Sequence, residues 1–192
     1  MIEDTKSQLK LISVLLQYPD EAFSRSLPSV TESIDTLSLS PSKEKLLQFV
    51  AFLGGKPLIR LQETYTETFD MNPSTCLNLT YHLLGDGENR GKMMAHIQQI
   101  YHQAGYETIT GELPDYLPLM LEFLSESPES NRPCELWSYL NPVEKLAGLL
   151  KDAGNPYSLL LDIVSDYVRK YTPQADIDTE YEDVHRRWGE MQ

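Results

Sequence analysis

Cysteine is scarce in this chain: Cys76 and Cys134 are the two among 192 residues, and they lie far apart in unlike surroundings. Two such thiols do not form the network of disulfides that stabilises small secreted domains. We therefore expect both cysteines to be reduced, as is usual for a cytoplasmic protein.

Basic side chains are fewer than acidic ones. The sequence has 16 Lys and Arg against 29 Asp and Glu, which gives a formal net charge of −13 at pH 7. Such a protein repels phosphate backbones and anionic membrane surfaces, and it attracts cationic partners. The composition argues against nucleic acid as a ligand and favours a partner with basic residues.

Long apolar runs are also missing, since none approaches the roughly 18 residues that a membrane-spanning helix needs. The first residues include Glu3 and Asp4, and no apolar block ending in small residues follows them. No secretory signal is therefore visible. The sequence predicts a cytoplasmic protein that does not insert directly into a membrane.

Patterns that carry catalysis or metal binding are absent as well. The four histidines show neither the i, i+4 pairing of zinc helices nor a nearby cysteine pair. The segment 85–92 resembles a phosphate-binding loop, but Asp86 stands where its first glycine is required and Met93 where its final hydroxyl is required. No serine lies in a G-x-S-x-G pattern. We expect no metal, no bound cofactor and no enzymatic activity.

Helical periodicity is what the sequence has in abundance. Apolar residues recur at three- and four-residue spacing, no segment alternates as a strand would, and no repeat period is present. We expect about eight helices. The expected helical segments are 8–18, a second from Asp20 into the 30s, 41–53, 57–69, 74–84, 89–104, one that starts near Pro118, 135–151 with a break at Asn141 and Pro142, and 156–171.

Length and charge distribution predict a single domain with a tail. A chain of this length can bury one sizeable core. Residues 1–171 are expected to form an all-α, single-domain helical bundle. Residues 172–192 are acidic and poor in aliphatic side chains, so they are expected to form a mobile C-terminal tail.

The stretch Glu112 to Leu124 is more specific than the rest. Pro114 and Pro118 lie four residues apart and cannot both sit deep inside a helix, so Pro118 is expected in a first turn. Asp115 would then cap that helix with a side-chain oxygen at the surface. The apolar residues at helical spacing behind it are Leu117, Met120, Leu121 and Leu124. These residues alone leave open whether Asp115 is only an N-cap or also a binding residue.

Four stretches together resemble the NarJ family of nitrate reductase assembly chaperones, a branch of the group that includes the TorD and DmsD proteins. They are Leu15 to Asp20 (LLQYPD), Tyr65 to Asp70 (YTETFD), Glu88 to Gly91 (ENRG) and the stretch from Glu112, whose E-x-P-D-[HY]-x-P pattern is the most specific. The resemblance spans roughly residues 9–124 and continues weakly through the last helix.

The resemblance implies an all-helical, cytoplasmic protein without enzymatic activity of its own. Such proteins bind the N-terminal leader of the catalytic subunit of a molybdenum enzyme, here the alpha subunit of a nitrate reductase, until its molybdopterin guanine dinucleotide is inserted. They thereby delay docking to the membrane partner or export. Proteins of molybdenum cofactor biosynthesis are candidate further partners. The resemblance leaves open which enzyme is served, whether its leader is a working twin-arginine signal, and whether the chaperone is a monomer or a helix-exchanged dimer.

The resemblance also implies a set of binding residues. Asp115 and Tyr116 match the acidic and ring positions of the motif, although many relatives have His where Tyr116 stands, which argues against a titrating ring. Tyr65 and Phe69 match an aromatic pair that lines the peptide groove. The expected peptide-binding residues are Tyr65, Phe69, Arg90, Gly91, Glu112, Pro114, Asp115 and Tyr116.

Two other functions are compatible with the residues. One is a generic helical adaptor for another cytoplasmic partner, which would not prefer the leader over a scrambled peptide. The other is a hydrolase whose residues are scattered over the groove, which would show turnover.

Overall fold

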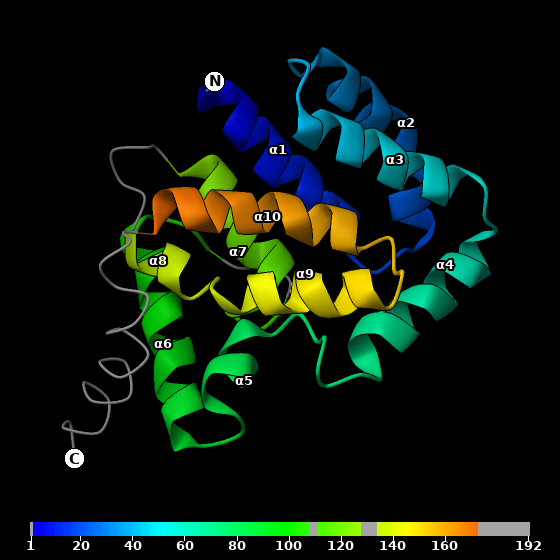
Figure 1. Cartoon of the computed structure of the whole chain (residues 1–192). Helices are drawn as coiled ribbons and strands as arrows, with labels where there is room; N and C mark the ends of the chain where they lie inside the picture. Colours follow the sequence, from blue (N-terminus) through cyan, green and yellow to red (C-terminus); the bar gives the residue numbers. More distant parts are fainter. Residues whose placement is uncertain (1, 108–110, 128–133, 173–192) are drawn as a thin grey trace.

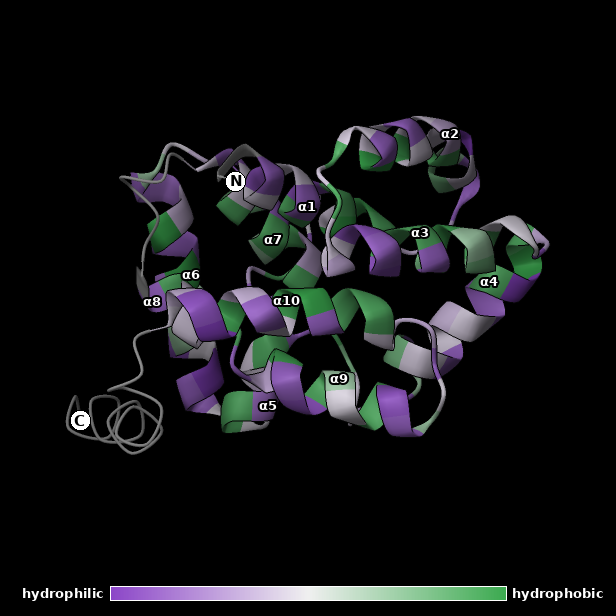
Figure 2. Cartoon of the chain, turned by 45° about the horizontal axis from the view of Figure 1, so that its top comes forward, coloured by the Kyte–Doolittle hydropathy of each residue, from purple (hydrophilic) through white to green (hydrophobic). Residues whose placement is uncertain are grey.

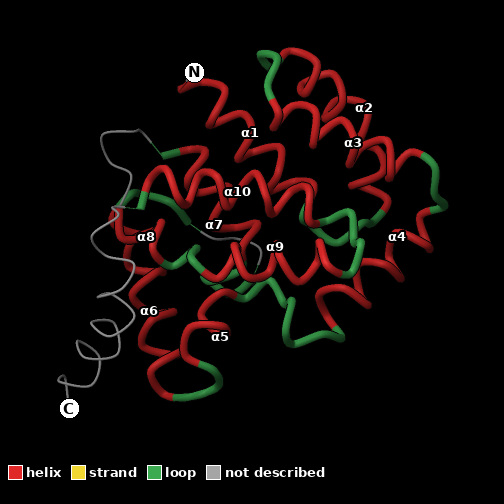
Figure 3. Tube along the Cα trace, in the orientation of Figure 1, coloured by secondary structure: helices red, strands yellow, loops and turns green. Residues whose placement is uncertain are grey.

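The computed structural model describes residues 2–107, 111–127 and 134–172 (Figure 1). The tail predicted for residues 172–192 lies outside the described residues apart from Thr172. Among the described residues no strand is formed, and an isolated bridge between Asn78 and Tyr116 is the only sheet-like pairing (Figure 3). The predicted all-α class is confirmed.

The described residues form ten α-helices and one π-helical turn, some of them short, against the eight or so predicted. Their bounds are α1 Ile2–Leu15, α2 Glu21–Thr36, α3 Pro41–Gly54, α4 Leu58–Tyr65, the π-helical turn η1 Thr66–Asp70, α5 Leu79–Leu84, α6 Glu88–Gln103, α7 Leu117–Glu126, α8 Cys134–Ser138, α9 Pro142–Asp152 and α10 Ser158–Tyr171. No helix in this part of the chain combines the length and apolar content needed to cross a membrane.

Two predicted helix starts are confirmed by their capping bonds. Asp20 Oδ1 accepts a hydrogen bond of 2.7 Å from the backbone N–H of Phe23 at the start of α2, and Ser40 Oγ accepts one of 3.2 Å from Lys43 at the start of α3. Each side chain satisfies an N–H that has no partner inside its helix.

The helix predicted for 89–104 begins at Glu88, one residue earlier, as α6. An N-cap at Asn89, which its residue type favours, is not formed, because Gly87 takes the N-cap position without a side-chain cap and Asn89 lies inside the first turn. The turn that leads into α6 is short because Gly85 adopts a φ of 64°, a left-handed conformation that glycine tolerates without steric cost. Glu88 takes the first helical position, where its charge is favourable to the helix dipole.

The segment 74–84 is helical only in its second half, α5. Its first half runs beside residues 115–117 instead: Leu117 N–H donates to Leu77 O at 2.9 Å, and Leu79 N–H donates to Asp115 O at 3.1 Å. The sequence of this segment mixes strand-favouring and helix-favouring residues. The pairing with residues 115–117 decides which of the two conformations each half adopts. The local sequence pattern does not reveal this pairing, because the partner lies far along the chain.

Helix α7 is the centre of the fold. The four apolar residues predicted to face inward are buried, and so are Leu119 and Phe123 on its other sides. Helix α7 packs along α1, and at its more exposed positions Lys10 Nζ lies 2.6 Å from Glu122 and 3.1 Å from Glu126.

Helices α9 and α10 form a second packed pair, and α3 lies along α10 (Figure 1). All three helices carry both apolar and polar residues (Figure 2), and apolar residues such as Phe49, Leu146 and Leu160 are buried. The core therefore runs continuously from α1 and α7 to α10, and the short elements η1 and α5 lie at its edge.

Candidate functional site

Segments far apart in the sequence meet at the hydroxyl of Tyr65. Tyr65 Oη donates to Leu16 O at 3.1 Å and lies 2.9 Å from Tyr116 Oη. A carbonyl can only accept, so the single Tyr65 proton goes to Leu16 and the Tyr116 hydroxyl donates to Tyr65. Leu16 follows the last residue of α1, where carbonyls lack helical partners. Three of the four family stretches are thus joined by two hydrogen bonds.

Around this hydroxyl lies a group of rings that we name the aromatic cluster. Its members are Tyr18, Tyr65, Phe69, Tyr116 and Tyr157. The Tyr65 ring lies edge-on to Phe69 at 5.0 Å and to Tyr18 at 5.5 Å, and Phe69 lies 4.8 Å from Tyr157. Such edge-on pairs stabilise beyond the area they bury.

The π-helical turn η1 explains how Tyr65 and Phe69 both point inward. The segment 57–69 was predicted as one helix, but α4 ends at Tyr65 and the backbone continues with π-type bonds through Asp70. The wider turn rotates the residues that follow it relative to an α-helix, and such bulges are frequent at functional sites. Both rings are 3% exposed, so they form the buried base of the aromatic cluster.

Tyr157 was not among the predicted site residues. It lies in the segment 156–171 that was predicted as the last helix, directly before the first residue of α10. Its ring lies 6.0 Å from that of Tyr65 and is 2% exposed. The periodic pattern around it was the only available signal, because nothing local relates it to Tyr65.

Two carboxylates lie near the exposed edge of the aromatic cluster. Burial raises the pKa of Tyr116, and the charges of Glu112 and Asp70 raise it further. Burial, Tyr116 and Asp70 likewise raise the pKa of Tyr65. Both phenols therefore stay protonated at ordinary pH and remain hydrogen-bond donors.

The prediction that Asp115 caps its own helix at the surface is wrong. Asp115 is 0% exposed, and the N-cap position of α7 belongs to Tyr116, which makes no side-chain cap. Its carboxylate instead accepts hydrogen bonds from the backbone N–H of Thr80 at 3.2 Å, from the Thr80 hydroxyl and from Asn78 Nδ2 at 3.2 Å. Asp115 therefore caps α5, because the pairing of 77–79 with 115–117 brings the start of that helix to it.

Arg90 completes what we name the polar cluster, with Asn78, Thr80, Asp86 and Asp115. Its Nη2 lies 3.8 Å from Asp115 Oδ2, its Nε donates to Thr80 Oγ1 at 3.2 Å, and its Nη1 donates to Asp86 at 2.9 Å. The guanidinium thus ties α6 to α5 and to the segment before α7. Arg90 belongs to the fourth family stretch, Glu88 to Gly91. This stretch adjoins the other three because its partner Asp115 directly precedes Tyr116 in the sequence.

The remaining predicted site residues differ in exposure. Gly91 and Glu112 are exposed, and a Cβ on Gly91 would meet no atom within 4 Å. Pro114 is partly buried, and its carbonyl accepts a hydrogen bond of 2.8 Å from Tyr101. The structure therefore gathers the predicted residues at one edge of the fold. It closes Tyr65, Phe69 and Asp115 off from solvent, and peptide contact by any of them stays a prediction.

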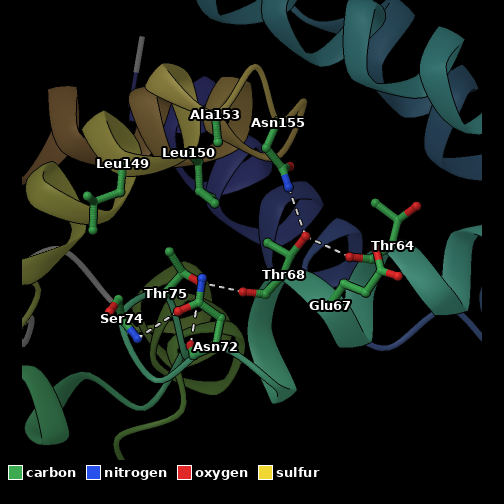
Figure 4. A pocket seen from close by; sticks show the side chains of 10 residues that line it. All are labelled: Thr64, Glu67, Thr68, Asn72, Ser74, Thr75, Leu149, Leu150, Ala153 and Asn155. Atoms are coloured by element: carbon green, nitrogen blue, oxygen red, sulfur yellow. Dashed lines mark hydrogen bonds between the residues drawn. The ribbon is translucent and has the colours of Figure 1, made fainter.

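A separate pocket of about 340 Å³ opens beside η1 (Figure 4). Helix α9 and the connection to α10 form one side, and the turn 72–75 forms the other. The residues that line it are Thr64, Glu67, Thr68, Asn72, Ser74, Thr75, Leu149, Leu150, Ala153 and Asn155.

Within the described ranges, no three His, Cys, Asp or Glu side chains gather as they would around a metal ion. Cys76 is a free thiol whose Sγ lies 3.5 Å from His82 Nε2, and burial raises its pKa. A thiol that keeps its proton is a weak ligand and a weak nucleophile.

Comparison with known proteins gives one family. Residues 38–161 match the family model described as nitrate reductase delta subunit. The chain is 33% identical to the probable nitrate reductase molybdenum cofactor assembly chaperone NarJ of Bacillus subtilis, over 84% of this chain and 88% of that protein. It is 29% identical to NarJ of Escherichia coli K12, which has the same chaperone name, over 88% of this chain and 79% of that protein. These names describe assembly chaperones and not enzymes.

A solved structure from Archaeoglobus fulgidus, described as a candidate redox enzyme maturation protein, has the same fold. It superimposes with a TM-score of 0.62 over 85% of this chain and 93% of that chain, at 21% sequence identity. The match of the family model covers more than half of the sequence, in the region that contains η1, the polar cluster and α7. The chain belongs to the nitrate reductase delta subunit family.

Proposed function

We propose that this protein is a cytoplasmic assembly chaperone that holds the N-terminal leader of the catalytic alpha subunit of a nitrate reductase. In this role it keeps the subunit competent for molybdenum cofactor insertion and delays its docking to the membrane partner or its export. The observation that carries the proposal is the convergence of the four family stretches on the adjoining aromatic and polar clusters. The chaperone names of the relatives support it.

The exposed edge of the aromatic cluster is the proposed contact surface. Tyr18 is 46% exposed and Tyr116 is half-buried, so both rings are available to apolar side chains of a leader. The exposed carboxylates of Asp70 and Glu112 are the acidic groups available to basic leader residues. Tyr65 and Phe69 support these rings from below.

Replacing Tyr18 with alanine is expected to weaken leader binding about tenfold or more, because aromatic anchors carry a large share of the energy of an interface. Tyr18 is exposed, and the fold should survive its loss. The measurement is isothermal titration calorimetry with a synthetic leader of the nitrate reductase catalytic subunit from the same organism. Circular dichroism reports whether helix content is retained.

Leu39→Ala is the matched control, because Leu39 is 93% exposed and lies in the α2–α3 connection. It should leave leader affinity unchanged. Equal affinities of Tyr18→Ala and the parent protein would exclude the aromatic edge as the contact surface. A scrambled peptide that binds as tightly as the leader would favour a generic adaptor.

Leader affinity is expected to fall severalfold between about 0.05 and 0.5 M salt, because the Debye length shortens from roughly 14 to 4 Å over this range. The net charge of −13 and the carboxylates at the proposed edge motivate this expectation. In the double variant Asp70→Asn with Glu112→Gln the salt dependence should become flatter. The same charge change on α2, Glu32→Gln with Asp35→Asn, is the control. A flat dependence in the parent protein would indicate purely apolar recognition.

A further inference from the structure

The pocket beside η1 combines one charge with an apolar wall. Among the described residues that line it, Glu67 is the only charged side chain, and no lysine or arginine is present. Glu67 is exposed, and its carboxylate makes no ion pair or hydrogen bond with the described part of the chain. An exposed carboxylate next to a hollow is available to a cationic ligand.

The opposite wall is apolar. Leu149 of α9 is 40% exposed, and Leu150 and Ala153 line the same side of the pocket (Figure 4). The turn opposite contributes the hydroxyl of Ser74 and the amide of Asn72. A carboxylate, neutral polar groups and an aliphatic wall suit a side chain that has an apolar stem and a cationic end.

The base of the pocket is fixed by hydrogen bonds. Asn155 Nδ2 donates to Thr68 Oγ1 at 2.8 Å, and Asn155 Oδ1 accepts from the backbone N–H of Tyr157 at 3.0 Å. The Thr75 hydroxyl donates to the carbonyl of Thr68. These bonds join η1, the turn 72–75 and the start of α10, so the hollow is part of the packed fold. Its volume of about 340 Å³ lies at the small end of the range for ligand sites.

We propose that this pocket binds an arginine side chain of a polypeptide partner, with the aliphatic stem against Leu149 and Ala153 and the guanidinium at Glu67. A planar guanidinium can donate to a carboxylate and to neighbouring oxygens at the same time, which a lysine ammonium does with less geometric specificity. None of the residues that line the pocket belongs to the aromatic cluster. The site is distinct from the aromatic edge and does not depend on the leader proposal.

The test uses the full chain labelled with ¹⁵N and titrated with N-acetyl-L-arginine methylamide. Saturable shifts are expected for the backbone amides of Glu67, Thr68 and Ser74, and Glu67→Gln should weaken the affinity about fivefold or more, because a hydrogen bond to a charged group loses its charge. Leu149→Ala should weaken it by a smaller factor. N-acetyl-L-norleucine methylamide and N-acetyl-L-glutamate methylamide should bind more weakly than the arginine probe.

Glu63→Gln is the matched control, since Glu63 lies one turn before Glu67, is ion-paired with Arg60 and does not line the pocket. It should leave the affinity for the arginine probe unchanged. Equal affinities of the parent protein and Glu67→Gln, or equal binding of the norleucine and arginine probes, would overturn the proposal. Shifts confined to the aromatic cluster would also overturn it, and they would leave the leader proposal intact.

Discussion

Asp115→Ala is expected to lower the free energy of unfolding by about 3–5 kcal/mol, the range found when one partner of a buried charge pair is removed. The carboxylate is fully buried, accepts three hydrogen bonds and lies 3.8 Å from the Arg90 guanidinium. Without this carboxylate, the backbone N–H of Thr80 has no side-chain acceptor, and Arg90 loses its buried ion-pair partner. Urea denaturation followed by circular dichroism measures the change.

Two further variants test whether the burial of Asp115 explains the size of this loss of stability. Asp86→Ala removes the exposed partner of the same arginine and should cost less than about 1 kcal/mol, as surface ion pairs do. Asp115→Asn keeps the shape and should fall between the two. An Asp115→Ala protein as stable as Asp86→Ala would contradict the role given to the polar cluster.

The burial of Asp115 and Phe69 limits which residues can be used to test leader binding. Asp115 and Phe69 are both buried, so alanine at either position changes the fold as well as any contact with a leader. Loss of binding in such a variant does not identify a contact residue. The exposed residues Tyr18, Asp70 and Glu112 are the informative positions.

Tyr65→Ala is the second change with a large expected effect, a loss of about 3–5 kcal/mol of unfolding free energy, as is usual when a buried aromatic side chain is cut to alanine. The ring contacts three other rings of the aromatic cluster and is 3% exposed. Tyr65→Phe keeps the ring and should cost about 1–2 kcal/mol, because it leaves Leu16 O and Tyr116 Oη without their partner.

A double-mutant cycle of Tyr65→Phe and Tyr116→Phe isolates the hydroxyl pair. The single changes should not be additive, with a coupling of about 0.5 kcal/mol or more between two groups in direct contact. Tyr18→Phe, on a half-exposed ring of the same cluster, should change stability by less than about 0.5 kcal/mol. Additive effects of Tyr65→Phe and Tyr116→Phe would show that their hydrogen bond contributes nothing to stability.

Local pattern determined most helix positions. The caps at Asp20 and Ser40 bond to N–H groups three residues away, and the break at Asn141 and Pro142 separates α8 from α9 as expected. In each case the physical cause lies within one turn of the residue, so the sequence is sufficient. The same limit explains the error at 74–84, where the partner segment lies far along the chain.

Motif resemblance determined the family and the residues that gather at one edge of the fold. It did not determine what each residue does there. The pattern around Asp115 predicts an N-cap, and Asp115 does cap a helix. That helix is α5, whose second residue, Thr80, lies 35 positions earlier in the chain. The sequence therefore predicted correctly that the carboxylate of Asp115 caps a helix, but it predicted the wrong helix.

Tertiary structure alone decided burial and long-range pairing. Tyr65 reaches Leu16 across 49 positions and Tyr116 across 51, and Tyr157 joins them from the start of the last helix. The pocket at Glu67 exists because the turn after η1 and the end of α9 meet there. Helical periodicity shows which face of a segment is apolar, but which other segment covers that face depends on the packing of the whole chain.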